Sequence, residues 1–435
     1  MSLLSAGAVA SGQVALNSGN AKADGQFGRA IAGLTDVTGD GRGEIIVGAR
    51  REGPGTSRMG RAYIFNGATG AIYRVLTSPH PESDGQFGAS VAGIADVNGD
   101  GCGDVIVGAP DEDPGNAPED AGRAYIISGR TGAVLSILAA PSQEFEGEFG
   151  DAVAGVPDVN GDGRPDVAVG ARSMDPGTAT ENSGRVYLYS GATGAYLRAL
   201  YTPTATLNGN FGDSLAGVAD LNGDGRGDVI VGAPSESWQV ANSGLVHLYS
   251  GATGVRIRSI PSPRREIGGR FGESVAAVPD VNQDGRADIV VGAPHEDPGS
   301  SPQDAGRAYV FSGVTGALLW ILYPPAADSA DDFGDAVAGL PDLNGDGRGD
   351  IAVGAHDADP GTAPSNSGRV HVYSGATGKR LFTLVSPHQA DDGRFGSAVA
   401  AVPDTNGNGF GDIAVGAEGE GGSPAESGRA YLFHP

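Results

Sequence analysis

The stretch "FGDAVAGVPDVNGDGRPDVAVGA" at residues 149–171 places an acidic, glycine-rich loop between two short apolar segments. Residues 149–158 alternate in polarity and residues 166–171 are apolar and valine-rich, so each segment predicts a β-strand. Two more strands are expected at residues 184–191 and 195–200, which flank the turn "SGATG". Because no segment has a convincing helical period, the unit predicts a four-stranded sheet.

The same unit recurs through the chain, and a Phe-Gly pair marks each start. The pairs are spaced by 60 or 62 residues and begin at Phe27, Phe87, Phe149, Phe211, Phe271, Phe333 and Phe395. Four short strands in each of seven units predict an all-β fold, a seven-bladed β-propeller of antiparallel blades. Independent domains are disfavoured because one such sheet buries too little core, and an open solenoid would need distinct capping repeats. We expect one propeller domain over residues 1–435.

The two ends of the chain predict how the ring closes. The last unit stops after its third strand, at residues 428–435, and so lacks a fourth. Ahead of the first Phe-Gly pair stands a surplus segment, in which Leu16 occupies the place that Leu76 has before the second pair. A strand at about residues 10–18 is therefore expected to complete the seventh blade and remove its exposed edge.

Composition narrows the classes of partner. The 435 residues carry a formal net charge of −25, which argues against nucleic acid and anionic membrane surfaces and favours cations. No apolar run approaches the roughly 20 residues of a membrane-spanning helix, so membrane insertion is not expected. The only cysteine is Cys102, which excludes an intramolecular disulfide. No basic segment precedes the apolar N-terminus, so we expect any export signal to have been removed.

The acidic loops supply oxygen ligands at a regular spacing. Counted from the first Asp, positions 1, 3, 5 and 9 hold Asp36, Thr38, Asp40 and Glu44; Asp96, Asn98, Asp100 and Asp104; Asp158, Asn160, Asp162 and Asp166; Asp220, Asn222, Asp224 and Asp228; Asp280, Asn282, Asp284 and Asp288; Asp342, Asn344, Asp346 and Asp350; Asp404, Asn406, Asn408 and Asp412. Position 7 offers its backbone carbonyl, which explains the variety of Arg42, Cys102, Arg164, Arg226, Arg286, Arg348 and Phe410.

Such a ligand pattern around a glycine at position 6 is typical of a calcium loop of the EF-hand type. There is no Glu at position 12, so we expect position 9 to coordinate directly. Magnesium is disfavoured because it prefers a strict octahedron with retained waters. Asx turns without a metal remain the alternative. We predict up to seven Ca²⁺, with the seventh site weakest because Asn408 replaces an acid there.

These motifs resemble the FG-GAP repeat proteins, whose best-known members are the propellers of integrin α-subunits. Phe-Gly occurs in all seven repeats and Gly-Ala-Pro at residues 108–110, 232–234 and 292–294. The resemblance implies a seven-bladed propeller with calcium loops between the first two strands of a blade, and protein-ligand recognition on the opposite face. The calcium concentration outside the cell fills loops of modest affinity, whereas the cytosolic concentration does not. An extracellular or cell-surface location is therefore expected.

The loops expected on that opposite face are longer and more varied. Residues 234–244 carry Trp238 in place of the recurrent Pro-Gly turn, and residues 261–269 carry Arg264 and Arg265. Trp and Arg are frequent hot-spot residues, so these three are the candidate ligand-binding residues, for a protein or glycan partner. Alternatively, Trp238 folds back over its own blade. The oligomeric state is not indicated.

Two other recurrent positions are interpreted as structural. A third-strand arginine is expected to pair with an acid, including one of a neighbouring blade; the set is Arg61, Arg123, Arg185, Arg307, Arg369 and Arg429. The Tyr or His two residues later is expected to pack in the core.

A binding or adhesion module is favoured over an enzyme, because no HExxH, GxSxG or Cys/His arrangement occurs. A purely structural, calcium-stabilised surface protein is the first alternative. A lyase or lipase is the second, in which His295 or His356 beside loop acids would act as a base.

Overall fold

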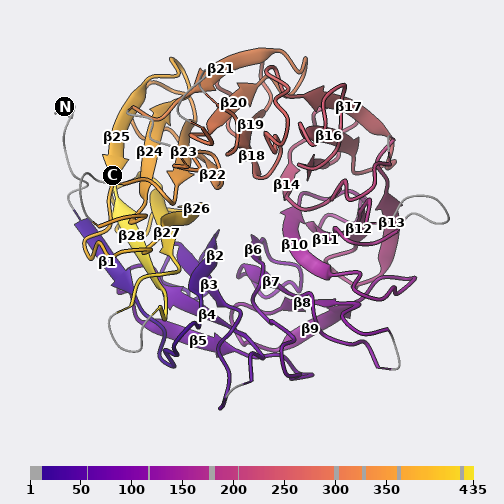
Figure 1. Ribbon diagram of the computed structural model, residues 1–435. Helices are drawn as coiled ribbons and strands as arrows, with labels where there is room; N and C mark the ends of the chain where they lie inside the picture. Colours follow the sequence, from indigo (N-terminus) through magenta and orange to yellow (C-terminus); the bar gives the residue numbers. More distant parts are fainter. Residues whose placement is uncertain are drawn as a thin grey trace.

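The computed structural model describes residues 12–55, 57–115, 118–175, 182–203, 205–297, 303–325, 330–359, 364–421 and 426–435. Within these ranges every regular element is a strand, and the strands form seven four-stranded antiparallel sheets arranged in a ring (Figure 1). The prediction of an all-β, seven-bladed propeller is confirmed. No helix in the described part of the chain has the length and apolarity to cross a bilayer.

Each blade runs from an inner strand at the ring's centre to an outer strand at its rim. The inner strands are β2 (Phe27–Leu34), β6 (Val91–Ile94), β10 (Phe149–Val156), β14 (Leu215–Val218), β18 (Val275–Val278), β22 (Val337–Leu340) and β26 (Phe395–Val402). The second strands are β3 (Glu44–Ala49), β7 (Asp104–Ala109), β11 (Asp166–Ala171), β15 (Asp228–Ala233), β19 (Asp288–Ala293), β23 (Asp350–Ala355) and β27 (Asp412–Ala417).

The outer half of each blade completes the sheet. The third strands are β4 (Arg61–Asn66), β8 (Arg123–Ile127), β12 (Arg185–Tyr189), β16 (Leu245–Ser250), β20 (Arg307–Phe311), β24 (Arg369–Ser374) and β28 (Arg429–His434). The outer strands are β5 (Ile72–Leu76), β9 (Val134–Leu138), β13 (Tyr196–Leu200), β17 (Arg256–Pro261), β21 (Leu318–Leu322), β25 (Arg380–Leu384) and β1 (Gly12–Leu16). We number the blades one to seven in the order of their inner strands.

The N-terminal strand closes the ring. β1 pairs antiparallel with β28, in a register that runs from Gly12 opposite His434 to Leu16 opposite Ala430. Leu16 is fully buried, as its counterpart Leu76 nearly is. The predicted closing strand is confirmed for Gly12–Leu16, while residues 10 and 11 of the prediction lie outside the described residues.

The core lies between neighbouring blades. All six residues of every second strand are buried, because both faces of that strand are covered. Each apolar cluster draws on two adjacent blades; one example unites Val278, Val290, Val310 and Leu322 of blade five with Phe333, Ile351, Val353 and Tyr373 of blade six. A blade therefore acquires its core only by packing on its neighbours, which explains why the units occur as a closed set.

The Phe-Gly pair joins one blade to the next. The backbone of Phe333 bridges in parallel to Gly306, which precedes the third strand of the previous blade. Gly306 has a φ of +80°, and a Cβ there would lie 2.1 Å from the carbonyl oxygen of Phe333. Only glycine permits this approach.

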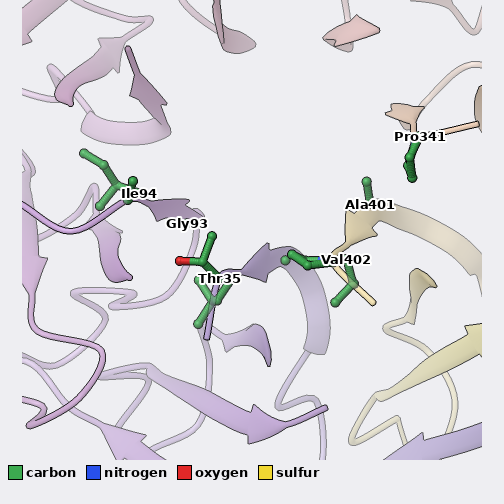
Figure 2. A pocket seen from close by; sticks show the side chains of 10 residues that line it. Thr35, Gly93, Ile94, Pro341, Ala401 and Val402 are labelled. Atoms are coloured by element: carbon green, nitrogen blue, oxygen red, sulfur yellow. The ribbon is translucent and has the colours of Figure 1, made fainter. Parts of the chain in front are cut away.

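The inner strands end around an apolar pocket of about 340 Å³. Figure 2 shows side chains from separate blades around this space, among them Ile94, Pro341 and Val402. The lining residues directly precede acidic loops of their blades, so these loops surround the same end of the ring.

Candidate metal centres and binding face

The acidic loops have one backbone conformation, which loop six illustrates. The two carboxylate oxygens of Asp342 at position 1 accept hydrogen bonds from the N–H groups of Gly345 (2.7 Å) and Gly347 (2.6 Å). Position 6 has a φ between +80° and +88° in all seven loops, a left-handed conformation that explains why glycine stands there.

Backbone donors also set the charge state at position 1. Although partial burial opposes ionisation, the N–H groups of positions 6 and 4 hold the pKa below its ordinary value at Asp96, Asp158, Asp220 and Asp404. In these four loops the backbone donors therefore favour the ionised form of the position 1 carboxylate.

The carboxylate at position 9 is fully buried at the foot of the loop. Asp350 accepts hydrogen bonds from the N–H groups of Leu343 (2.9 Å) and Gly375 (3.2 Å). Burial nevertheless raises the pKa of Asp350 and of Glu44 to about 7, and that of Asp104 and Asp228 to about 6. Burial of an acid is tolerated best where a cation neutralises it, so this position fits a metal ligand.

Loop one brings its carboxylates together. One oxygen each of Asp36, Asp40 and Glu44 lies within 4.8 Å of the other two. Oxygens bound to one Ca²⁺ at about 2.3–2.6 Å can be separated by up to about 5 Å, so this donor set fits a single calcium ion.

Loops with Asn at position 3 fit with one adjustment. The amide nitrogen of Asn160 donates to Asp166 Oδ1 at 3.0 Å, and Asn344 donates to Asp350 Oδ1 at 3.1 Å. The amide thus lies beside the carboxylate ligands. Coordination requires the carbonyl oxygen of the same amide to face the centre, which a half-turn of the amide achieves.

A serine at the end of the third strand holds position 5, a role that the sequence analysis missed. Ser250 Oγ donates to Asp224 Oδ2 at 3.1 Å, and Ser312 makes the same contact with Asp284 at 3.1 Å. This contact places the acidic loops and the "SGATG" turns on one face. The Ser that precedes the first Gly of the "SGATG" turn recurs in the sequence and was the available signal.

Position 7 also has a side-chain role that the sequence analysis did not predict. Arg226 Nη1 lies 2.9 Å from Asp158 Oδ2, and Arg286 Nη1 lies 3.1 Å from Asp220 Oδ2, in each case in the loop of the preceding blade. The guanidinium groups therefore link neighbouring loops. Cys102, which is buried, and Phe410 interrupt this chain of contacts at their two blades.

Loop seven differs in its surroundings as well as its sequence. His434 Nδ1 lies 3.1 Å from Asp412 Oδ1, while Asp412 Oδ2 accepts a hydrogen bond from the backbone of Thr405 at 2.8 Å. Together with Asn408 at position 5, this places fewer free anionic oxygens in loop seven than in loops two to six.

On the opposite face, the structure joins the two loops predicted to bind a ligand. Arg265 Nη1 donates to Gln239 Oε1 at 2.8 Å, which connects the Arg264 and Arg265 loop to the chain neighbour of Trp238. Trp238 keeps 38% of its surface exposed, and both arginines are exposed.

The recurrent Tyr or His of the third strand is packed as predicted, but it also has a polar partner. The Tyr309 ring packs on the Phe271 ring, with the two ring centroids 5.7 Å apart, and the Tyr309 hydroxyl donates a hydrogen bond to the buried Glu296. Equivalent Tyr–Glu pairs occur with Glu52, Glu112 and Glu420. The glutamates stand three residues after Gly-Ala in the sequence, which was the signal.

A third-strand arginine pairs with an acid, as predicted, in blades two, three and five; in blade three Arg185 Nη1 lies 4.0 Å from Glu144 Oε1 in the loop that connects blade two to blade three, whereas in blades two and five the acid belongs to the same blade. Arg307 Nη1 lies 3.5 Å from Glu296 and Arg123 Nη1 lies 3.3 Å from Glu112, in the loop between the second and third strands. In blade four Leu245 replaces the arginine, and His247 Nε2 lies 3.0 Å from Glu236 instead.

Charged side chains also gather where the inner strands begin, on the face opposite the acidic loops. Arg172 contacts Glu148 at 2.7 Å, Asp151 at 3.2 Å and Asp213 at 3.1 Å. Burial raises the pKa of Asp151 to about 7 although Arg172 opposes this shift. We call this region the mouth. Sequence reasoning named His295 and His356 of this region, beside Asp332 and Asp357, but it did not predict the contacts of Arg172.

Comparisons with known proteins agree with this architecture. The model of the FG-GAP repeat matches residues 27–73, 87–127, 149–189, 211–249, 271–311, 333–373 and 395–433. Integrin alpha-IIb of Mus musculus is 34% identical over 211 residues, which are 44% of this chain and 20% of that protein. Integrin alpha-8 of Gallus gallus is 31% identical over 226 residues, 48% of this chain and 20% of that protein. The matched part thus spans about a fifth of the length of these relatives.

Proposed function

Since the chain belongs to the FG-GAP repeat family, we propose that it is a calcium-binding, integrin-like propeller that acts as an extracellular adhesion or ligand-binding module. The observation that carries the proposal is the sevenfold acidic loop with its converging oxygen ligands. Up to seven Ca²⁺ bind at positions 1, 3, 5, 7 and 9 of these loops and stabilise the blades.

Calcium also supports the proposed location. Extracellular modules work with calcium sites of about 10⁻⁴–10⁻³ M affinity, which cytosolic calcium would not fill. These loops lack the bidentate Glu of an EF-hand, so affinities in that range are expected. The identity with integrin α-subunits supports the same location at the cell surface or outside the cell.

The ligand binds on the face opposite the calcium loops, at Trp238, Arg264 and Arg265. An exposed indole beside two exposed guanidinium groups suits a carboxylate-bearing partner, because arginine binds carboxylates through paired hydrogen bonds. An acidic peptide or a uronic-acid glycan has this chemistry. Arg264 and Arg265 place two positive charges together on a chain with a net charge of −25.

A protein and glycan array screen, run with calcium and with chelator, tests this function. Acidic ligands are expected to bind in calcium, and Trp238→Ala is expected to weaken binding by at least about 30-fold, since central hot spots contribute about 2 kcal/mol or more. Leu207→Ala is the matched control, because Leu207 is an exposed apolar residue of a neighbouring loop.

The melting temperature of each variant separates recognition from packing. If Trp238→Ala lowers the melting temperature and leaves binding unchanged, Trp238 supports its blade and the proposed ligand site is wrong.

A further inference from the structure

The mouth differs from blade to blade at four equivalent positions. These are the residue before Phe-Gly, the residue after it, and the two residues after the Gly-Ala that ends the second strand. Blade one has Gln26, Arg29, Arg50 and Arg51 there, whereas blade six has Asp332, Asp335, His356 and Asp357. We call the latter set the blade-six quartet. It combines three carboxylates with one imidazole, all of them metal-ligand types.

The distances within the quartet suit a shared ion. His356 Nε2 lies 3.5 Å from Asp357 Oδ1 and 3.8 Å from Asp332 Oδ2, and one donor atom of each of these residues lies within 4.8 Å of the others. Both separations exceed a normal hydrogen bond. Two ligands on a tetrahedral Zn²⁺, with bonds of about 2.0–2.2 Å, are about 3.4 Å apart.

The second imidazole nitrogen lies within ion-pair distance of a carboxylate, without hydrogen-bond geometry. His356 Nδ1 lies 3.3 Å from Asp335 Oδ2. Metal-binding histidines commonly direct the nitrogen that does not bind the metal to a carboxylate, which fixes the ring and directs the other nitrogen at the metal. Asp335 is thus placed as a positioning residue for His356.

A buried oxygen of the quartet has no hydrogen-bond partner. Asp357 Oδ1 is inaccessible to solvent and accepts no hydrogen bond, although it forms a long ion pair with Arg394 Nε at 3.7 Å. Leaving a buried anionic oxygen without a partner is costly. A cation between Asp357 and His356 Nε2 would satisfy it.

Blade three shows how the same positions are neutralised without a metal. There Arg172 occupies the place of His356 and contacts Glu148 and Asp151, which occupy the places of Asp332 and Asp335. Arg172 also contacts Asp213 of blade four. In blade six an imidazole, which unlike a guanidinium can be neutral and bind a metal, faces the three carboxylates of Asp332, Asp335 and Asp357.

We propose that Asp332, His356 and Asp357 bind one divalent transition-metal ion, with Zn²⁺ the best suited. Mixed imidazole and carboxylate donors favour such ions over calcium, which takes oxygen ligands. His295 Nε2 lies 3.9 Å from Asp332 Oδ1 and offers a further imidazole. Because all three ligand residues remain partly exposed, a coordination position stays open to the mouth.

Titration of the full chain with Co²⁺ tests the site. Millimolar calcium is kept in the buffer so that the acidic loops are filled. Wild type is expected to bind one Co²⁺. The bound Co²⁺ should show visible absorption bands, which Zn²⁺ should abolish by displacing it. His356→Gln and Asp357→Asn should each lower the affinity at least about tenfold, and Asp335→Asn by about 10–100-fold.

His80→Gln is the control, since His80 is an exposed histidine outside the quartet; it should bind Co²⁺ as wild type does. Circular dichroism and melting in calcium verify folding, and Asp332→Asn replaces any variant that fails to fold. If wild type binds no Co²⁺ in calcium, or binds it as tightly as His356→Gln does, the site does not exist. Either result would contradict this metal site alone and would not bear on the proposals for the calcium loops and the Trp238 surface.

Discussion

The two faces of the ring repeat to very different degrees. On the face of the acidic loops, position 1 is Asp, position 6 is Gly and position 9 is an acid in all seven blades. At the mouth, the residues equivalent to His356 are Arg50, Pro110, Arg172, Pro234, Pro294 and Glu418. Every blade has the same structural requirement on the first face, so the same residue types recur there. The second face is free to differ, and a constellation that occurs there once, such as the blade-six quartet, points to a particular ion or partner.

Calcium removal should produce the largest effect and would break the comparison most directly. At millimolar calcium and a Kd of about 10⁻⁴–10⁻³ M, each filled loop is expected to add about 0.4–1.4 kcal/mol, and several loops act together. Melting followed by circular dichroism should therefore show a large drop in melting temperature when excess chelator replaces millimolar calcium.

Magnesium at the same concentration serves as the control and should restore little of the lost stability, because it prefers a strict octahedron. Equal melting in chelator and in calcium would falsify the metal interpretation of the repeated face.

Removal of the closing strand is expected to have the next largest effect, and it would destabilise both faces together. Deletion of residues 1–18 removes β1 and exposes the edge of β28, so aggregation and a lower melting temperature are expected. Light scattering and a melting curve measure this. Deletion of residues 1–9 keeps β1 and should behave as wild type. A monodisperse 1–18 deletion with unchanged melting would show that closure does not depend on β1.

The sequence predicted the fold and the repeated face because their signals recur at fixed spacing. Phe333 and its six equivalents mark the blades, and Leu16 marks the closing strand by its position alone. A feature present in seven copies needs no knowledge of tertiary structure to be noticed.

Contacts between segments far apart in the chain escaped prediction. Arg226 reaches Asp158, and Asp332 reaches His356, only because packing sets one blade or strand beside another. The sequence spacing of such a pair says nothing of its distance in space. The partner of Tyr309 escaped for another reason: Glu296 looked like one more acid of an acidic loop region, and only its complete burial shows its role.

A pH titration tests another difference between blades, the surroundings of the buried third-strand histidine His371. In blade six Ala358 stands where five of the other blades have the buried glutamate, so His371 lacks that acid and forms a hydrogen bond with Thr383 through Nδ1 at 2.9 Å. Burial, with Arg380 and Arg369 nearby, lowers the pKa of His371 to about 3. The ordinary value is about 6.5, so between about pH 6.5 and 3 the unfolded chain binds a proton that the folded chain does not.

Stability from this group is therefore complete above about pH 6.5 and falls with decreasing pH by up to about 1.4 kcal/mol per pH unit. Melting temperature measured from pH 7 to 4 should fall less steeply for His371→Gln than for wild type. His80→Gln, which removes an exposed histidine, controls for the loss of one imidazole. Identical slopes for His371→Gln and wild type would show that His371 titrates normally in the folded protein.

The smallest effect expected is a change in one loop that makes the repeated face more uniform. Loop seven has Asn408 at position 5, where loops one to six have Asp, and His434 lies beside its position 9 carboxylate. Asn408→Asp restores the missing charge, and calcium affinity rises with the number of charged ligands. We expect this variant to tighten the weakest site by roughly tenfold, about 1.4 kcal/mol, so that the last phase of a calorimetric calcium titration moves to lower concentration. Asn406→Asp adds the same charge at position 3, where Asn is the rule in loops two to six, and serves to separate position from charge. If neither change moves the last phase, the weakest site lies in another loop, and loop seven is no exception on its face.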